Sequence, residues 1–154
     1  MATKNRIVAV SKENFDDLLD LVEKYQAFYR VENIDRVRNR DFFSRFLDEP
    51  DEGLQYIAYR GDEAVGFTTL YFPYSSTRAG RFALMNDLFV RGEVRGTGIG
   101  AALIEKAAEV AEARGYSDLA WMTAQDNVTA QRLYDRFDAN KSAWIEYTMP
   151  TKAG

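Results

Sequence analysis

The sequence of 154 residues contains no cysteine and no histidine. Without cysteine the chain cannot form a disulfide, a zinc–thiolate site or a thiol nucleophile. Without histidine it lacks the usual general base near neutral pH and the central member of a Ser-His-Asp triad. Any catalysis must therefore use carboxylates, tyrosines, backbone groups, bound water or a co-substrate. We predict no metal site, and these absences suit a reaction whose second substrate arrives already activated.

Long apolar runs and an excess of positive charge are also missing. No segment approaches the roughly 18 consecutive apolar residues of a membrane span, so we expect no membrane partner. Residues 1–6 are polar and differ from a secretory signal, which leads us to expect a cytoplasmic protein. The formal net charge is −4, whereas nucleic-acid binding needs a basic surface, so we predict no nucleic-acid partner.

The pattern of apolar residues predicts a single α/β domain over residues 1–154. Hydrophobic residues make up 46% of the chain, which is typical of a globular protein, and no repeat or flexible linker interrupts it. Period-two and helical spacing predict the order β-α-α-β-β-β-α-β-α-β and a mixed sheet. The expected strands are 6–10, 54–59, 64–72, 81–90, 117–123 and 143–149, and the expected helices begin near residues 15, 35, 99 and 127.

A glycine-rich segment separates the strand 81–90 from the following helix. Its sequence is Arg95-Gly96-Thr97-Gly98-Ile99-Gly100. Glycines let the backbone approach an anion closely, and the helix adds its positive N-terminal end, so a pyrophosphate is well accommodated. The spacing differs from the dinucleotide fingerprint and from a Walker loop. Taken alone, the segment is also compatible with a tight strand-to-helix turn.

Two motifs together resemble those of the GNAT superfamily of N-acetyltransferases. The family's cofactor motif, Arg/Gln-x-x-Gly-x-Gly/Ala, is matched by Arg95, Gly98 and Gly100, after a strand that ends in Leu88-Phe89-Val90. A second signature, Asn-x-x-Ala-x-x-x-Tyr, is matched by Asn127, Ala130 and Tyr134. Residues 25–29, 46–50, 121–127 and 130–134 further resemble the yeast histone, polyamine and D-amino-acid N-acetyltransferases and their bacterial relatives.

The resemblance implies a GNAT fold, a single mixed and splayed β-sheet flanked by helices, and acetyl-CoA as co-substrate without a metal. Leu88 and Val90 should bind the pantetheine through their backbones, with Phe89 between them and a bulge near Leu88. Asn127 and Ala130 should line the pantetheine and adenine side. The residues that should wrap the pyrophosphate, beside Arg95, are Gly96, Thr97, Gly98, Ile99, Gly100 and Ala101.

The resemblance also implies two catalytic residues. Tyr134 occupies the position that usually protonates the departing thiolate, and a phenol suits that role because its ordinary pKa of about 10 exceeds that of a thiol, about 8.5. Its ring is equally suited to simple packing. Asp87 is the candidate base, acting through water, or it only binds the substrate ammonium. Asn86 stands where some polyamine-acetylating relatives have a second carboxylate, so that pair is incomplete here.

The acceptor is predicted as a small-molecule amine. Tyr25, Phe28 and Tyr29 are expected to form an aromatic wall that holds an alkylammonium by cation–π contact, although tyrosines at this spacing also occur in ordinary cores. Asn86, Asp87 and Trp121 complete the predicted substrate-binding set. A small amine, amino acid or polyamine is our first expectation. Protein lysine or N-terminal acetylation and a non-catalytic acyl-CoA-binding module are the alternatives. We also expect a homodimer that pairs through the strand 143–149.

Overall fold

The computed structural model describes residues 4–153. The chain divides into two compact units, the first ending at Met122 and the second beginning at Thr123, and each is described by itself. The first unit contains β1 (Asn5–Ala9), α1 (Phe15–Phe28), α2 (Arg36–Asp48), β2 (Gly53–Arg60), β3 (Glu63–Tyr71), β4 (Tyr74–Ser75), β5 (Gly80–Arg81), β6 (Ala83–Val90), a short 3-10 helix (Gly92–Val94), α3 (Ile99–Ala113) and β7 (Leu119–Ala120). The second unit contains α4 (Val128–Tyr134).

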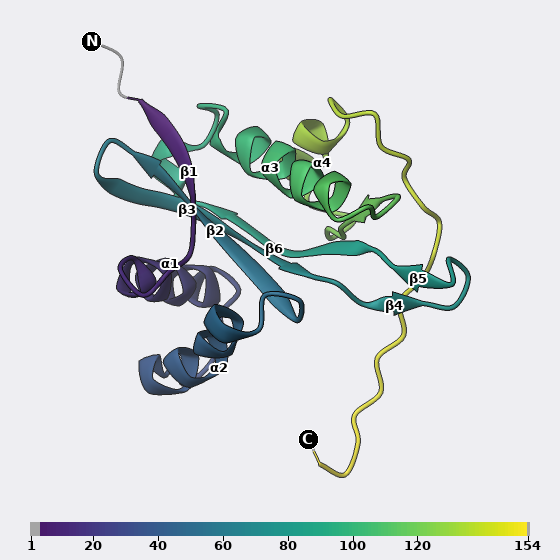
Figure 1. The fold of residues 1–154 in the computed structure, drawn as a ribbon, viewed down its shortest axis with the longest axis horizontal. Helices are drawn as coiled ribbons and strands as arrows, with labels where there is room; N and C mark the ends of the chain where they lie inside the picture. The colour runs from purple at the N-terminus through teal and green to yellow at the C-terminus, as the bar shows by residue number, and fades with distance from the viewer. Residues whose placement is uncertain (1–3, 154) are drawn as a thin grey trace. The chain divides into compact units, whose positions relative to one another are not determined.

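The first unit is built on a five-stranded sheet with the order β1-β2-β3-β6-β7 (Figure 1). Neighbouring strands are antiparallel except β6 and β7, which are parallel, so the sheet is mixed as predicted. The β2–β3 hairpin turns at Gly61, whose φ of 62° is accessible to glycine with little strain. The small hairpin of β4 and β5, which we had not predicted, extends from the end of β3.

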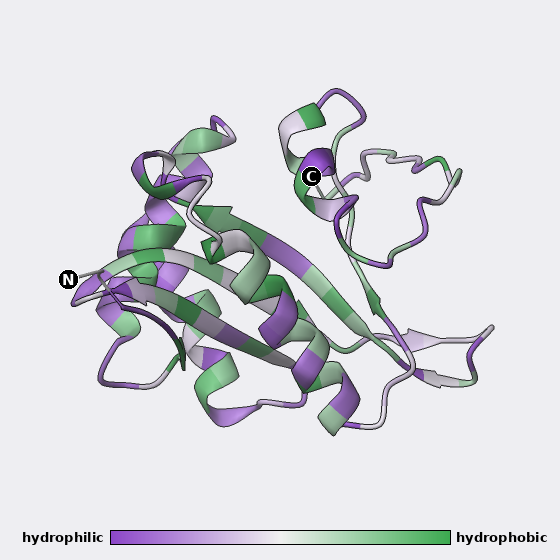
Figure 2. Cartoon of the chain, turned by 90° about the horizontal axis from the view of Figure 1, so that it is seen from above, coloured by the Kyte–Doolittle hydropathy of each residue, from purple (hydrophilic) through white to green (hydrophobic). Residues whose placement is uncertain are grey.

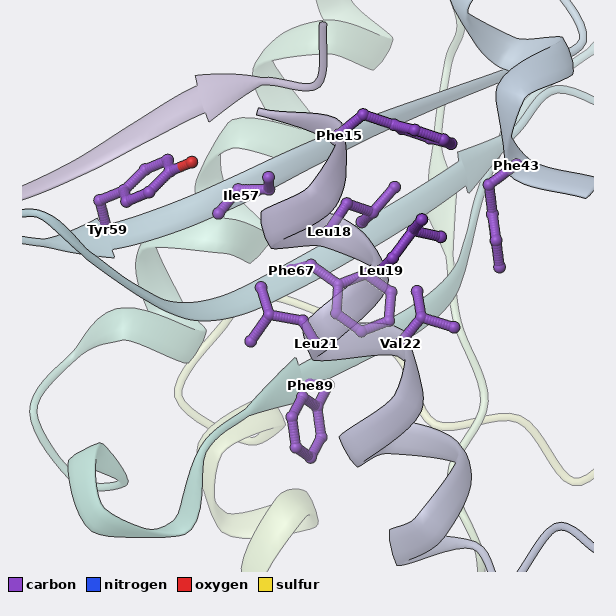
Figure 3. Packing of buried hydrophobic residues seen from close by; sticks show 10 residues of the cluster. All are labelled: Phe15, Leu18, Leu19, Leu21, Val22, Phe43, Ile57, Tyr59, Phe67 and Phe89. Carbon is purple, nitrogen blue, oxygen red and sulfur yellow. The ribbon is translucent and has the colours of Figure 1, made fainter. Parts of the chain in front are cut away.

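Alternate residues of the strands pack against helices on opposite faces of the sheet. α1 covers one face, and its buried residues meet strand residues that include Ile57, Phe67 and Phe89 (Figure 3). On the other face, Leu103 of α3 packs with Ala58 and Val65. Hydrophobic and hydrophilic residues alternate along the helices in Figure 2, as expected when one side of each helix is buried.

The helix boundaries follow from local signals. Asp35 accepts hydrogen bonds from the backbone N–H groups of Val37 and Arg38, at 2.9 and 3.2 Å, and so caps the start of α2. α3 ends at Ala113 and is followed by Gly115, whose φ is 77° and whose N–H donates to the carbonyl of Glu112. Among residues 4–153 no helix combines the length and the apolar character that crossing a bilayer requires.

Two strand predictions were wrong: one strand is much shorter than predicted, and the other does not form. The predicted strand 117–123 is reduced to β7, two residues that pair with Ala83 and Leu84. The predicted strand 143–149 is extended chain without strand pairing in the described part of the structure. Its β-branched and aromatic residues favour β-structure locally. A strand forms, however, only when the backbone of a neighbouring strand hydrogen-bonds with it.

Candidate functional site

One edge of the C-terminal half of β6 has no strand paired with it in the described part of the chain. Arg91 N–H bonds to the carbonyl of Val65, and the Asp87 carbonyl accepts from the Thr68 hydroxyl, both on the β3 side. Because successive strand residues direct their backbone groups to opposite edges, Leu88 and Val90 direct theirs away from β3. Since β7 pairs only with Ala83 and Leu84 within residues 4–153, the sheet is splayed at this point, as the resemblance implied.

A β-bulge in β6 places two polar side chains together. Thr69 pairs with Asp87 and Leu70 with Met85, so Asn86 is the inserted residue, two positions before the expected bulge at Leu88. In a regular strand neighbouring side chains point to opposite faces. Here Asn86 Nδ2 donates to Asp87 Oδ1 at 3.2 Å, which shows that the bulge has brought both onto one side.

Asp87 is a half-buried carboxyl group on the α1 side of the sheet. Burial raises its pKa above the ordinary value, and hydrogen bonds from Tyr25, Thr69 and Asn86 act in the opposite direction. The bond from the Tyr25 hydroxyl to Asp87 Oδ1 is 2.8 Å long. A carboxyl group in this position can accept a proton or hold a cationic amine, which are the two roles considered for it.

The three aromatic residues predicted for the acceptor site lie together at the end of α1. The ring centroids of Tyr25 and Tyr29 are 5.0 Å apart, and those of Phe28 and Tyr29 are 5.2 Å apart. Phe28 and Tyr29 are 54% and 60% exposed, whereas Tyr25 packs on the core beside Phe67. The three rings are therefore neighbours, and the hydroxyl of Tyr25 is engaged by Asp87.

The glycine segment exposes its backbone at the start of α3. Gly96 and Gly98 have φ values of 83° and 88°, a left-handed conformation that favours glycine, and Gly98 is the N-cap residue of α3. Among the described residues no atom lies within 4 Å of a Cβ added at either glycine. Val94 and Ile99 are buried in the core on either side and anchor the turn. Together with the helix N-terminus, this open backbone fits a pyrophosphate.

Arg95 connects the glycine segment with the acceptor wall. Its Nε donates to the carbonyl of Val90 at 3.1 Å, and its guanidinium carbon lies 5.2 Å from the centre of the Phe28 ring. The side chain therefore occupies a backbone acceptor that we had assigned to the pantetheine. Thr97 is held by a hydrogen bond from its hydroxyl to the carbonyl of Val94, and Gly100 and Ala101 belong to the first turn of α3.

The second unit carries the Asn-x-x-Ala-x-x-x-Tyr signature on α4. Asn127 caps the helix, and its side-chain oxygen accepts from the Ala130 N–H at 3.2 Å, so these two predicted residues are in contact. Tyr134 is the last residue of α4 and is half-buried. In the first unit, Trp121 directly follows β7 and is half-buried as well.

An acidic hollow of about 600 Å³ lies at the end of α2. Asp48, Glu49, Asp51 and Glu52 line it together with Arg45. A concentration of carboxylates gives this part of the surface a negative potential, which favours the approach of cations. Among residues 4–153 there is no group of three or more side chains of the metal-binding types His, Cys, Asp and Glu that is placed to hold a metal ion.

Comparison with known proteins identifies the fold and the class of enzyme. The family model described as "Acetyltransferase (GNAT) family" matches residues 18–139. The chain belongs to the GNAT family of acetyltransferases. It is therefore an acyl-CoA-dependent transferase, and the α/β fold with its mixed sheet and flanking helices is the GNAT fold that we predicted.

Relatives cover almost the whole chain. A thialysine N-epsilon-acetyltransferase of Caenorhabditis elegans is 28% identical over 147 residues, covering 93% of this GNAT chain and 90% of that protein. The crystal structure of a probable acetyltransferase is 28% identical, with a TM-score of 0.84 and coverage of 96% and 98%. The aminoglycoside N-acetyltransferase AAC(6')-Iy, solved in complex with CoA, has the same TM-score of 0.84 at 14% identity and 97% coverage of each chain, and so shares the fold.

Sequence reasoning missed the polar residues beneath Asp87. Thr69 and Gln55 are buried in neighbouring strands, where the Gln55 amide donates to the Thr69 hydroxyl at 2.9 Å. A polar pair in otherwise apolar strands is a signal that can be recognised, because buried polar groups require partners. The Tyr25–Asp87 bond has no such signal, since it joins residues 62 positions apart.

Proposed function

We propose that this GNAT enzyme transfers the acetyl group of acetyl-CoA to the primary amine of a small molecule, with amino acids and polyamines as the first candidates. The observation that carries the proposal is the Asp87 carboxyl group, which is half-buried beside Tyr25 and adjoins the free backbone edge at Leu88. An ammonium group needs a carboxylate for binding and must lose a proton before it attacks.

Acetyl-CoA, when bound, supplies an activated acyl thioester. Gly96, Gly98 and the N-terminus of α3 would hold its pyrophosphate through backbone N–H groups, because their conformation leaves that backbone open. Leu88 and Val90 would receive the pantetheine along the splayed edge of β6. At Val90 the Arg95 side chain would have to release the carbonyl that it now binds.

Proton transfers complete the assigned roles. Asp87 binds the substrate ammonium and accepts its proton, directly or through water, before the new N–C bond forms. Tyr134 would supply a phenolic proton to the departing thiolate and would be reprotonated from solvent. The exposed Tyr29 ring, and Phe28 if Arg95 moves from it, would contact the cationic substrate.

The names of the relatives support an amine acceptor. The C. elegans relative is named for the epsilon amine of thialysine, and the CoA-bound structural neighbour is named for aminoglycosides. Within the family we propose the yeast histone, polyamine and D-amino-acid branch on the sequence stretches named above, and this placement stays a prediction.

The test is a thiol-release assay with acetyl-CoA and a panel of lysine, thialysine, spermidine, aminoglycosides and a lysine peptide. We expect release with at least one small amine, and Asp87→Asn should raise KM for that amine far more than KM for acetyl-CoA. Tyr134→Phe should lower kcat by about 10²-fold or more with little change in cofactor affinity. Release only with the peptide would favour protein acetylation, and tight CoA binding without release would favour a non-catalytic module.

We further propose that the enzyme is a homodimer. The extended segment 143–149 exposes four large apolar side chains, namely Trp144, Ile145, Tyr147 and Met149. A concentration of exposed apolar residues on a strand-forming sequence is typical of a surface that another chain covers.

A further inference from the structure

The hydroxyl group of Tyr25 is aimed at the candidate catalytic carboxylate by its surroundings. Its ring lies edge-on to Phe67 and Phe89, with centroid separations of 5.4 and 5.9 Å, and both neighbours are buried. Packing of this kind restricts the ring to one orientation. In that orientation the hydroxyl donates to Asp87 Oδ1 at 2.8 Å, an ordinary hydrogen-bond length, and the bond is charge-assisted when Asp87 is ionised.

The sheet holds Asp87 from the other side. Thr69 pairs with Asp87 in the β3–β6 register, where it lowers the pKa of the carboxyl, and its hydroxyl accepts from the Gln55 amide. The Thr68 hydroxyl donates to the Asp87 carbonyl at 2.8 Å. Asp87 is therefore held to β3 through its backbone and to α1 through the Tyr25 hydroxyl.

The number of donors decides how the carboxyl group can receive a substrate. A carboxylate offers about four acceptor positions. Tyr25 and Asn86 both donate to Oδ1, and so use two of these positions. The remaining capacity suits one N–H of an ammonium, provided that the carboxylate is held still, because catalytic groups must be fixed before the substrate arrives.

We propose that Tyr25 is the positioning residue of the acceptor site, whose hydroxyl holds Asp87 in the orientation that receives the substrate ammonium. This inference rests on the proposed role of Asp87 in amine acetylation. Tyr25 acts through Asp87, and its ring serves the core, so its contribution differs from the cation–π role that the sequence had suggested for it.

The titratable groups around Asp87 allow the proposal to be tested by pH. Burial and the Asp87 charge raise the pKa of Tyr25, and burial raises the pKa of Tyr71 to about 12, so both phenols stay protonated near neutral pH. Tyr29 adjoins Tyr25, and Arg45 of α2 faces Tyr71, whose pKa its positive charge lowers slightly against the effect of burial. Asp87 is thus the member of this group that titrates on the acidic side. Removing the hydrogen bond from Tyr25 should therefore raise the pKa of Asp87.

The experiment compares Tyr25→Phe with Tyr59→Phe over about pH 5 to 9, using the best primary amine from the panel. Tyr59 is a matched control, because its hydroxyl also donates to a carboxylate, Asp17 Oδ2 at 2.6 Å, within the same core cluster. We expect Tyr25→Phe to lower kcat/KM for the amine roughly tenfold and to move the acidic limb upward by about one pH unit, with KM for acetyl-CoA unchanged. Tyr59→Phe should keep the parent's kinetics and acidic limb.

Two further measurements distinguish a failure of the role of Tyr25 from a failure of the proposed function. Asp87→Asn is assayed in parallel, and ¹³C NMR titration of the Asp87 carboxyl in the parent and in Tyr25→Phe reports its pKa without any turnover. If Asp87→Asn is impaired while Tyr25→Phe matches the parent in kinetics and carboxyl titration, the role of Tyr25 is overturned and the function stands. If Asp87→Asn matches the parent, the role of Asp87 fails and that of Tyr25 fails with it.

Discussion

At the scale of single residues, Asp87 combines two opposing demands. Burial disfavours its charged form, whereas ammonium binding needs the charge. The donors on its oxygens offset part of this cost, and the first of them is Tyr25. An ionised Asp87 carboxylate serves substrate binding but lowers the stability of the fold, as active-site residues commonly do. The balance between these effects can be measured as stability against pH.

Asp87→Asn should be more stable to unfolding than the parent near neutral pH. Because the folded-state pKa of Asp87 is raised, its ionisation weakens the fold as pH rises through that pKa, and no penalty exists below the ordinary value of 3.8. Urea unfolding of both proteins from about pH 4 to pH 8 should show the gap widening with pH.

Asp118→Asn provides the opposite sign in the same experiment. The hydrogen bond from Arg78 lowers the pKa of Asp118, so its contribution to stability is complete above the ordinary value of 3.8 and is lost only as pH falls through the lower folded-state pKa. This variant should therefore be less stable than the parent by a nearly constant amount from about pH 4 to pH 8. An Asp87→Asn protein that is less stable than the parent across the whole range would mean that the hydrogen bonds outweigh burial.

At the scale of elements, the site depends on where regular structure is interrupted. The insertion of Asn86 in β6 turns Asp87 and Asn86 to one side, and the left-handed Gly98 begins α3 with its backbone exposed. Neither interruption follows from periodicity, which predicted β6 and α3 well, and the family resemblance placed the bulge near Leu88 and not at Asn86. The turn before α3 was predicted because three glycines at alternate positions form a recognisable motif. A bulge depends on the register of β6 with β3, so the sequence of β6 alone does not determine it.

Gly98→Ala should weaken acetyl-CoA binding beyond its effect on stability. A left-handed alanine costs about 1–2 kcal/mol, and the added methyl group would enter the open space above the backbone. Gly115→Ala is the matched control, since Gly115 has a φ of 77° at the other end of α3 and is similarly unencumbered. We expect similar losses of stability in both variants, but a raised KM for acetyl-CoA only in Gly98→Ala. Equal KM values would remove the pyrophosphate from this turn.

At the scale of the whole molecule, local patterns predicted the first unit far better than the second. The long elements from β1 to α3 were located within a few residues because each has a buried face with clear periodicity, as at Leu18, Phe67 and Leu103, whereas the two-residue strands β4 and β5 were missed. α4 was found through its motif and its Asn127 cap. The strand at 143–149 was wrong, since pairing partners are a property of the assembled protein and not of a segment. The Tyr25–Asp87 contact could not be predicted for the same reason.

The exposed segment 143–149 is the part of the chain that we expect a second copy to cover in a homodimer. Trp144 and Tyr147 are 92% and 90% exposed, which is unusual for large aromatic residues on a surface that stays in water. If a second copy covers this segment, sedimentation equilibrium of the parent should give twice the chain mass of 17.6 kDa. Trp144→Glu should shift the protein toward the monomer, because a buried unpaired charge opposes association.

Glu146→Lys is the matched control for that experiment, because it changes charge within the same segment while keeping every apolar side chain that would be buried. We expect it to remain dimeric, with far-ultraviolet circular dichroism confirming that both variants are folded. A parent that sediments as a monomer at micromolar concentration would contradict the dimer. A dimer that survives Trp144→Glu unchanged would place the interface elsewhere, and the exposed aromatic residues would then need a partner other than a second copy of this chain.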